Sequence, residues 1–326
     1  RYAVDENWLI PHFEKMLYDN AQFVLLLTKY LGVEKNEYFE KKAIQTIDFI
    51  NKNFINHESK LLGSAYDADS EGEEGKYYIF SYDELKKIKN INQYYDIKPE
   101  GNWENKIILK EIKVPPERII LALKKLRAKK IKPSFDNKIQ LDINCIWVSA
   151  LVSAEKILPN NNFLKAAETY CENLEKSFFN KEKLQHTIQK PEVFLEDYAY
   201  SIAMFLDLYD QTLKPNYLFK AKELCKKTIK LFYIKEKLIF QKNIIATNDL
   251  FHKPIDISDG NIPNGNSVML LNFTRLKMKS EATELSVSLN GYLNIYKSLM
   301  GSAIKSIDYY NMTDSDKNCT NKGCLI

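Results

Sequence analysis

Hydrophobic residues recur along this chain in a pattern that predicts four copies of one helical hairpin, each of about 35 residues. In every copy a long apolar helix opens on a small polar residue, and a second helix follows that carries Lys and Glu on one face. The first helices are expected to begin at Asn20, Asn144, Tyr198 and Asn266. The second helices are expected to run from Tyr38 to Phe54, Phe163 to Phe179, Tyr217 to Tyr233 and Thr283 to Met300.

The two helices of each hairpin differ in polarity, and this difference predicts two layers. An isolated hairpin leaves its apolar face in water, so the copies must pack side by side. The first helices are apolar nearly all round and are expected inside, whereas the second helices form the outer wall. An open solenoid and a closed ring of inner and outer helices both satisfy this pattern.

The bulk composition fits one large helical domain, which we place at residues 1–312, followed by a polar tail at 313–326. Because the chain starts at Arg1 without a Met, it is interpreted as an N-terminally truncated fragment. The tail carries Cys319 and Cys324 with four residues between them, a spacing too long for a thioredoxin-type motif.

Charge and hydropathy exclude several classes of function. The 47 Lys and Arg residues are well mixed with 43 Asp and Glu residues, which argues against a nucleic-acid reader. No apolar run reaches the ~18 residues of a membrane span. Five cysteines, an odd count, fit a reducing compartment, so a cytoplasmic location is expected. No motif for a cofactor is present, and none is expected to bind.

The links between hairpins hold the residues that packing explains least. In a ring, every link from an outer helix to the next inner helix lies at the same end, which we call the mouth. Asp, Asn, Glu, Gly and Pro crowd these links. A ring would therefore enclose a cavity with polar residues at its mouth and apolar residues at its base, as a small-molecule site requires.

The segment PHFEKMLYDNA predicts a helix that starts at Pro11, which suits the first helical turn. On that helix His12 and Asp19 would share a face within about 20°, with Lys15 roughly 60° away. Glu14 would occupy the first turn, where a carboxylate is favoured. His12 is thus a candidate general acid or base oriented by a carboxylate. The alternative is a capped helix whose histidine packs under a loop.

The segment DADSEGEEG predicts an acidic, hairpin-like loop. Asp67, Asp69, Glu71 and Gly72 match positions 1, 3, 5 and 6 of a calcium loop, but Tyr78 stands where a bidentate glutamate is required. We therefore reject calcium and expect no metal here. Asp67 and Asp69 would turn either into the mouth or into hydrogen bonds that hold the loop.

Two further links place polar residues at the start of an inner helix. Glu196 and Asp197 precede one helix, and Asn264 and Asn266 flank the start of another, where capping alone could explain them. Aromatic residues that adjoin the links could stack on sugar rings; these are Trp8, Tyr66, Tyr77 and Tyr198. His57 and His186 are interpreted as solvent-exposed residues without a role.

With these segments in view, the sequence resembles the thioredoxin-domain-containing family of the spermatogenesis-associated protein 20 type. The resemblance is carried in order by RYAVDENWLIPHFEKMLYDNA, AYDADSEGEEGKYYIF, LEDYAYSIAMFLDLYDQT, DGNIPNGNSV and CTNKGC. It implies an (α/α)6 toroid, similar to the six-hairpin glycosidases and N-acylglucosamine 2-epimerases, and so favours the ring. It also implies an N-terminal thioredoxin-like domain as a partner in the full-length protein, which this chain lacks.

We therefore expect a carbohydrate-active domain, either sugar epimerase- or isomerase-like or glycoside-processing. The catalytic candidates are His12, Glu14, Asp67, Asp69 and Asp197. The substrate-binding candidates are Trp8, Lys15, Asp19, Tyr66, Glu71, Asn144, Glu196, Tyr198, Asp259, Asn264 and Asn266. The alternative is a non-catalytic toroid that binds a ligand or partner and works with the thioredoxin-like domain.

Overall fold

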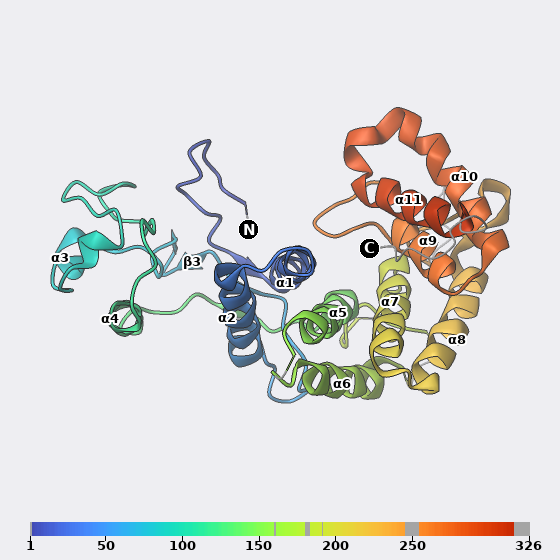
Figure 1. The fold of residues 1–326 in the computed structure, drawn as a ribbon, viewed down its shortest axis with the longest axis horizontal. Coiled ribbons are helices and arrows are strands. Elements are labelled where there is room, and N and C mark those ends of the chain that lie inside the picture. The colour runs from blue at the N-terminus through green and yellow to red at the C-terminus, as the bar shows by residue number, and fades with distance from the viewer. Residues whose placement is uncertain (1, 160, 180–182, 191, 245–253, 316–326) are drawn as a thin grey trace. The chain divides into compact units, whose positions relative to one another are not determined.

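The structure is a computed structural model that describes residues 2–159, 161–179, 183–190, 192–244 and 254–315, and it is mainly helical (Figure 1). All four expected hairpins are present. Their first helices are α1 (Leu17–Leu31), α5 (Leu141–Ile157), α7 (Leu195–Thr212) and α9 (Gly265–Arg275). Their second helices are α2 (Glu37–Asn53), α6 (Phe163–Leu174), α8 (Pro215–Phe232) and α10 (Lys279–Tyr296).

The chain divides into two compact units. Unit 1 consists of Arg1–Asp19 and Gly63–Asn137, and unit 2 consists of Asn20–Leu62 and Lys138–Ile326. Unit 2 contains the helical hairpins, whereas unit 1 contains the first link and the long excursion between α2 and α5.

The inner helices of three hairpins begin about one turn earlier than the sequence pattern predicts. Asn20, Asn144 and Tyr198 therefore lie inside the first turn and do not open the helix, which corrects the expectation. In α5, the Asn144 Nδ2 donates back to the carbonyl of Gln140 at 2.8 Å. This shift also brings Asp142 into the first turn of α5.

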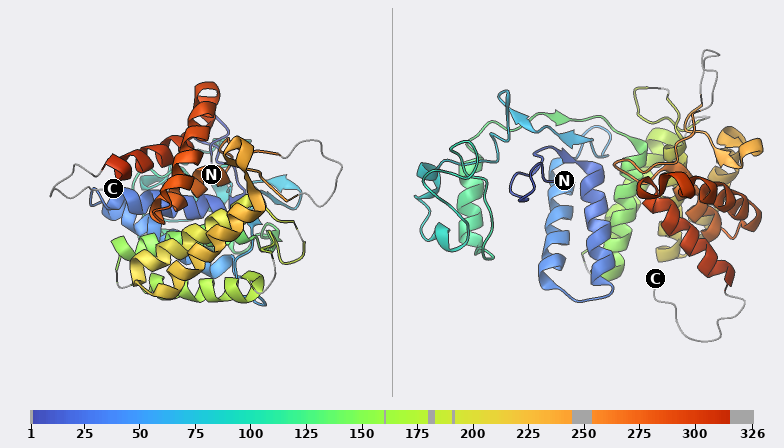
Figure 2. Two further views of the ribbon diagram at one scale, coloured as in Figure 1. Left: turned by 90° about the vertical axis from the view of Figure 1, so that its right-hand side faces the viewer. Right: turned by 90° about the horizontal axis from the view of Figure 1, so that it is seen from above.

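The hairpins of unit 2 pack in chain order, with α5 against α7 and α7 against α9 (Figure 2). Thr28 in α1 hydrogen-bonds Ser153 in α5 at 2.7 Å, which joins these two inner helices. The Tyr170 hydroxyl in α6 donates to Asn51 in α2 at 3.1 Å, which joins the outer helices of the same hairpins. The expected inner and outer layers are thus both present.

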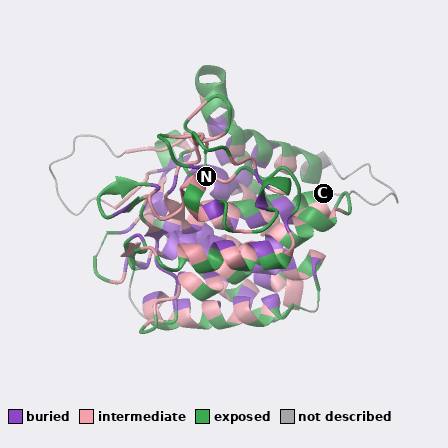
Figure 3. Cartoon of the chain, turned by 90° about the vertical axis from the view of Figure 1, so that its left-hand side faces the viewer, coloured by how far each residue is buried: buried purple, intermediate pink, exposed green. Residues whose placement is uncertain are grey.

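The burial of side chains differs between the inner and the outer helices. Helices α5 and α7 are buried on nearly every side, with Trp147 and Tyr198 among the largest wholly buried side chains. In the outer helices α2, α6 and α8, buried positions recur between exposed ones, as is typical of an amphipathic helix (Figure 3). Helix α1 differs from the expectation because Phe23 and Leu26 remain exposed on it.

A further helix, α11 (Gly301–Ser315), follows the last hairpin and was not predicted. It packs against α9, and its Lys305 lies beside Lys29 of α1. The short elements of unit 2 are the π-helix η2 (Glu175–Phe179), the 3-10 helices η3 (Lys235–Lys237) and η4 (Lys297–Leu299), and the paired strands β6 (Tyr233–Ile234) and β7 (Ile239–Phe240). Cys319 and Cys324 lie outside the described residues.

Unit 1 is built from short strands and two small helices around its own core. A three-stranded antiparallel sheet joins β1 (Lys15–Met16), β2 (Ala65–Tyr66) and β5 (Phe135–Asp136). The strands β3 (Asp69–Ser70) and β4 (Glu73–Glu74) form a hairpin, and α3 (Tyr82–Leu85), the 3-10 helix η1 (Ile91–Gln93) and α4 (Glu117–Arg127) complete the unit. Phe80, Leu85, Ile107, Ile119 and Leu123 are central to its hydrophobic core.

No helix within the described ranges is both long enough and apolar enough to cross a membrane.

Candidate functional site

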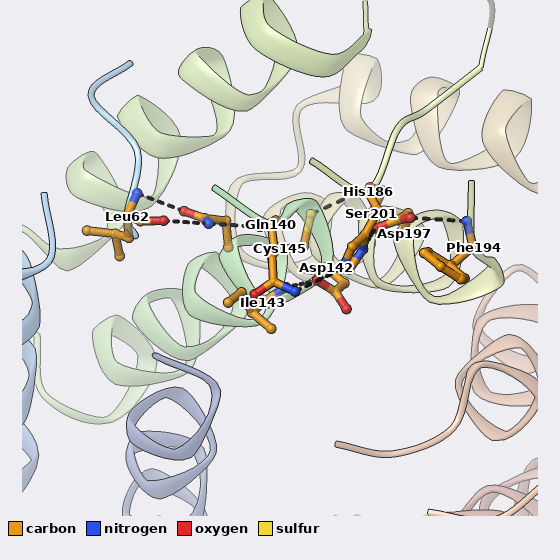
Figure 4. Close-up of polar contacts among 10 residues, drawn as sticks. Leu62, Gln140, Asp142, Ile143, Cys145, His186, Phe194, Asp197 and Ser201 are labelled. Atoms are coloured by element: carbon orange, nitrogen blue, oxygen red, sulfur yellow. Dashed lines mark hydrogen bonds and ion pairs between the residues drawn. The ribbon is translucent and has the colours of Figure 1, made fainter. Parts of the chain in front are cut away.

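The amino-terminal turns of α5 and α7 bring three titratable side chains together, and we call them the acid–histidine cluster: Asp142, His186 and Asp197 (Figure 4). The Nδ1 of His186 lies 2.9 Å from Oδ1 of Asp197 and 3.9 Å from Oδ1 of Asp142. One potential ligand atom from each residue lies within 4.8 Å of the others. Two carboxyl groups therefore face one imidazole.

Local backbone bonds hold each member of the acid–histidine cluster. The Leu141 N–H donates to the His186 carbonyl at 2.9 Å, which fixes the loop against the start of α5. Asp197 is the third residue of α7, and its Oδ2 accepts from the Phe194 N–H at 3.2 Å, a typical way to satisfy a free donor at a helix start. Asp142 accepts from the Ile143 N–H at 2.7 Å.

Burial shifts the proton affinities of the cluster. The side chain of Asp197 is 0% exposed and that of Asp142 8%, while that of His186 is 20% exposed. Burial, reinforced by the charge of Asp197, raises the pKa of Asp142 to about 7. Burial alone would lower the pKa of His186, but its hydrogen bond to Asp197 and the two nearby carboxylates raise that pKa to about 9. The cluster thus holds exchangeable protons near neutral pH.

Gln140 contacts the ring nitrogen of His186 that faces away from Asp197. Its Nε2 lies 2.9 Å from Nε2 of His186, and in this orientation the amide donates to the ring when the imidazole is neutral and keeps its proton on Nδ1, facing Asp197. Protonation of the second ring nitrogen requires the Gln140 amide to turn so that its oxygen faces the ring. Gln140 can therefore follow the protonation state of His186.

The same three residues could hold a divalent metal ion. Imidazole and carboxylate are the ligands that zinc and related ions accept, and each residue of the cluster offers one ligand atom. A bound ion would replace the Nδ1 proton of His186 and the contact with Asp197.

Glu196, a predicted substrate-binding residue, lies beside the cluster at the start of α7. Its Oε1 accepts from the Gly265 N–H at 3.2 Å, so it joins the amino ends of α7 and α9. Burial raises the pKa of Glu196 above its ordinary value. The buried Tyr200 hydroxyl donates to the Pro263 carbonyl at 2.7 Å and connects the same two helix starts.

The predicted binding residues Asn264 and Asp259 cap the helices that follow them. Asn264 Oδ1 accepts from the Ser267 N–H at 3.0 Å, and its Nδ2 donates to Asp259 Oδ1 at 3.0 Å. Asp259 Oδ2 accepts from the Ser302 N–H at 2.7 Å, at the start of α11. Tyr198, another predicted residue, is wholly buried, and its hydroxyl accepts from the Leu184 N–H at 3.0 Å.

The structure corrects the predicted helix at Pro11. Residues 11–14 are not helical, and Pro11 pairs with Ala3 in an antiparallel bridge. Helix α1 begins only at Leu17, because Lys15 and Met16 are taken up by the sheet with β2.

The proposed pair of His12 and Asp19 on one helix face is therefore wrong. Asp19 lies in the first turn of α1, whereas His12 stacks on Tyr2 with ring centroids 4.8 Å apart. Glu14, which precedes β1, is not in a helical first turn. Lys15 lies in β1, with its Nζ 3.2 Å from the centroid of the Tyr78 ring.

The acidic loop of unit 1 is confirmed as a hairpin. Asp67 holds it: Oδ1 accepts from the Asp69 N–H at 3.2 Å, and Oδ2 accepts from the Ser134 hydroxyl at 3.0 Å. Asp69 is exposed, and Glu71 occupies the left-handed turn with φ of 55° beside Lys76. The structure thus supports the loop-holding alternative for Asp67.

Two aromatic candidates of unit 1 differ in their surroundings. Trp8 is 83% exposed, in a left-handed backbone conformation with φ of 56°. Tyr66 lies in β2, with its ring centroid 4.8 Å from that of Phe135 in the neighbouring strand.

His57 is exposed, as predicted, but the prediction for His186 is wrong. Its charged loop folds back onto the start of α5, so the imidazole meets Asp197 of the following helix and Asp142, which lies far from it in the sequence. Asp142 was also missed, because it precedes Asn144, where the helix was expected to begin. A signal was available, since both LDIN at α5 and LEDY at α7 place Leu and then an acid in the first turn.

Sequence comparison connects the chain to a longer protein. No protein-family model matches the chain. Spermatogenesis-associated protein 20 of Rattus norvegicus is 27% identical over 339 residues, which cover 85% of this chain and 43% of that protein. The chain therefore spans less than half the length of this curated relative.

Structural comparison identifies the fold. A sugar epimerase from a ruminal bacterium matches with a TM-score of 0.55 at 10% identity, covering 87% of this chain and 62% of that one. A GH76 alpha-mannanase of Bacteroides thetaiotaomicron matches with a TM-score of 0.56 at 13% identity, covering 93% and 70%. The chain is thus distantly related to spermatogenesis-associated protein 20, and its helical hairpins match part of the six-hairpin α/α toroid fold that sugar epimerases, isomerases and glycosidases share.

Proposed function

We propose that this chain is a carbohydrate-active domain that moves protons to and from a sugar at the acid–histidine cluster. The observation that carries the proposal is the contact of His186 with two buried carboxyl groups, which brings proton affinities close to neutral pH. Perturbed titratable groups of this kind are typical of catalytic sites. The fold shared with sugar epimerases, isomerases and glycosidases supports a sugar as the substrate class.

Exposure suggests the role of each member. His186 is the most exposed of the three and is the group that would meet the substrate. Asp197 is wholly buried and would position the ring and stabilise its positive charge. Asp142, whose pKa is raised to about 7, would be the nearby acceptor for the proton that His186 must release before it can act as a base. This division resembles the way in which a carboxylate orients a histidine base in other enzymes.

The geometry favours an epimerase- or isomerase-type reaction over glycoside hydrolysis. In such a reaction a base removes the proton from the carbon beside a carbonyl, the C–H electron pair becomes the enediolate double bond, and an acid returns the proton. The neutral imidazole would take the proton, and the imidazolium so formed would return it from the same side, whereas inversion of the carbon needs a second proton donor on the opposite side. A glycoside hydrolase instead needs two carboxyl groups on opposite sides of the bond to be cut. Asp142 and Asp197 face the same ring.

Glu196 remains our candidate for binding sugar hydroxyl groups. It lies next to Asp197 at the start of α7, and only its Oε1 accepts a hydrogen bond from the Gly265 N–H. Asn144 and Asn266 are weaker candidates, because their side-chain amides bond to backbone groups.

The test is proton exchange in deuterated water. The chain is incubated with mannose, glucose and cellobiose in D2O, and the loss of the C2–H signal and the formation of the epimer are followed by proton NMR. We expect at least one sugar to exchange, and His186→Gln to lower the rate at least about a hundredfold, as loss of a general base does. His57→Gln, which changes an exposed histidine, is the matched control. Exchange that survives in His186→Gln, or no exchange with any sugar, would refute the proposal.

A second candidate function is a non-catalytic domain that binds a sugar or a partner within a longer protein. It is favoured by the length of the rat relative, of which this chain matches 43%. The resemblance noted above suggests a thioredoxin-like domain as that partner. The same experiment separates the two functions, because a binding domain would show thermal stabilisation by a sugar without any exchange at C2.

A further inference from the structure

Unit 1 contains a cavity of about 320 Å³ that the proposed function does not use. Its walls come from the segment before β1, from β1, from the turn after β4, and from α4. Phe13, Phe80, Tyr95 and Leu123 form buried apolar walls, and three of these four belong to the hydrophobic core of the unit. The volume lies near the lower end of the ~300–1,000 Å³ that is usual for small-molecule sites.

Positive charge is concentrated at this cavity. Lys15, Lys124 and Arg127 all line it, and no described residue of its lining is an Asp or Glu. In the chain as a whole the two signs are nearly balanced, with 47 Lys and Arg against 43 Asp and Glu. The charged residues of this cavity are thus all cationic, in contrast to the nearly balanced charge of the whole chain. The electrostatic field of these residues favours the binding of an anion.

Aromatic rings hold two of these cations in place. The Nζ of Lys15 lies 3.2 Å from the centroid of the Tyr78 ring, and the Tyr78 ring stacks on Phe13. The Arg127 guanidinium lies 5.6 Å from the centroid of Tyr77. A ring face attracts a cation without cancelling its formal charge, so these groups are oriented and still able to bind an anion.

We propose that this cavity binds a small organic anion with a flat apolar body. The carboxylate or phosphate group would meet Lys15, Lys124 and Arg127, and the body would pack against Phe13 and Leu123. Arg127 can hold either group through two parallel hydrogen bonds. The residues all belong to unit 1, so this site is independent of the acid–histidine cluster and of the sugar reaction proposed for it.

The test compares matched probes by isothermal titration calorimetry on the full chain. Phenyl phosphate and phenylacetate carry the two anionic groups, and phenylacetamide is the neutral counterpart. We expect one or both anions to bind at least about tenfold more tightly than phenylacetamide, which corresponds to one charge-assisted hydrogen bond. The better anion shows whether the site is built for phosphate or for carboxylate.

Two substitutions on the accessible side of α4, Lys124→Gln and Arg127→Gln, should each weaken the better anion about tenfold. Lys15→Met should do the same, provided that thermal unfolding shows unit 1 intact. Lys113→Met removes an exposed lysine of the same unit that does not line the cavity, and it should leave binding unchanged. Equal affinity for anions and phenylacetamide, or equal losses in Lys113→Met and Arg127→Gln, would overturn the proposal.

Discussion

Asn144 and Leu62 exchange two hydrogen bonds in which a side-chain amide pairs with the backbone as a neighbouring strand would. The Leu62 N–H donates to Asn144 Oδ1 at 3.0 Å, and Asn144 Nδ2 donates to the Leu62 carbonyl at 3.0 Å. Asn266 repeats the arrangement with Phe240, at 3.0 and 3.1 Å. In both cases the asparagine connects an inner helix to the segment that follows the preceding outer helix. The repeated asparagine therefore stabilises the packing of successive hairpins.

Replacement of either asparagine should therefore destabilise the hairpins. Asn144→Ala and Asn266→Ala each leave a buried backbone N–H and carbonyl without a partner, and we expect the free energy of unfolding to fall by ~2–4 kcal/mol. Urea denaturation followed by circular dichroism measures the change. Asn290→Ala, at an exposed position of α10, is the control and should change stability by less than ~0.5 kcal/mol. Equal effects in all three variants would contradict this role.

The titration of His186 should depend on Asp197. In the intact chain the hydrogen bond and the nearby carboxylates raise the pKa of His186 to about 9 against the effect of burial. In Asp197→Asn the raising contribution of Asp197 is removed while burial remains, so the pKa should fall below 9 toward or beneath the ordinary value of about 6.5. The NMR shift of the His186 Cε1 proton across pH reports the midpoint, with His57 as an internal reference. A midpoint that is the same in both proteins would refute the proposed coupling.

The stabilisation contributed by the acid–histidine cluster should decrease as pH rises from acidic to mildly alkaline values. The folded pKa of His186, about 9, exceeds the ordinary value of 6.5, so its stabilisation is complete below pH 6.5 and is lost as pH approaches 9. The pKa of Asp142 is about 7 in the folded state, compared with an ordinary value of 3.8, so Asp142 also binds its proton more tightly in the folded state. The stabilisation that this proton contributes is therefore lost as pH rises from 3.8 to about 7.

Asp142→Asn keeps the shape of the side chain and removes this titration. The variant should lose less stability than the parent chain between pH 4 and pH 7, measured by urea denaturation at fixed ionic strength. A parallel fall in both proteins would show that Asp142 is not protonated in the folded state near neutral pH.

Two glycines of the acidic hairpin allow a matched test of packing in unit 1. Gly72 and Gly75 have similar backbone angles, with φ of 77° and 72°, so an added Cβ strains both alike. At Gly75 the Cβ would lie 2.5 Å from the ring of Phe13, whereas at Gly72 nothing lies within 4 Å. Gly75→Ala should therefore destabilise unit 1 by ~1–3 kcal/mol more than Gly72→Ala. Thermal unfolding of the two variants measures the difference.

The helical hairpins could be predicted from the sequence because their signal is local. Apolar periodicity over each helix fixes its existence, and the outer helices end close to the positions expected from Phe54 and Phe179. The starts of the inner helices were placed late because the asparagines resemble caps. Only the structure shows that Asn144 bonds to Leu62, a residue that is distant in the sequence.

The candidate site was harder to predict because its contacts are long-range. Pro11 carries a strong local helix signal, but pairing of Lys15 with Tyr66 in the sheet overrides it. His186 lies in a polar stretch that gives no sign of burial, and its meeting with Asp142 depends on how the loop returns to α5. Asp197, by contrast, was predicted, because an acid in the first turn of an apolar helix is visible in the sequence itself.

The bond between Asp67 and Ser134 has a consequence for how this chain can vary. The Asp67 N–H donates to the Ser134 carbonyl at 3.0 Å, directly beside the paired strands β2 and β5. The two ends of segment 68–133 therefore lie next to each other beside the three-stranded sheet. The entropy lost in closing a loop between two adjacent points grows only slowly with the length of the loop. The excursion can be lengthened, shortened or replaced by a tight turn while β1, β2 and β5 keep their register. It is a natural place for related proteins to gain or lose a binding function without rebuilding their helices.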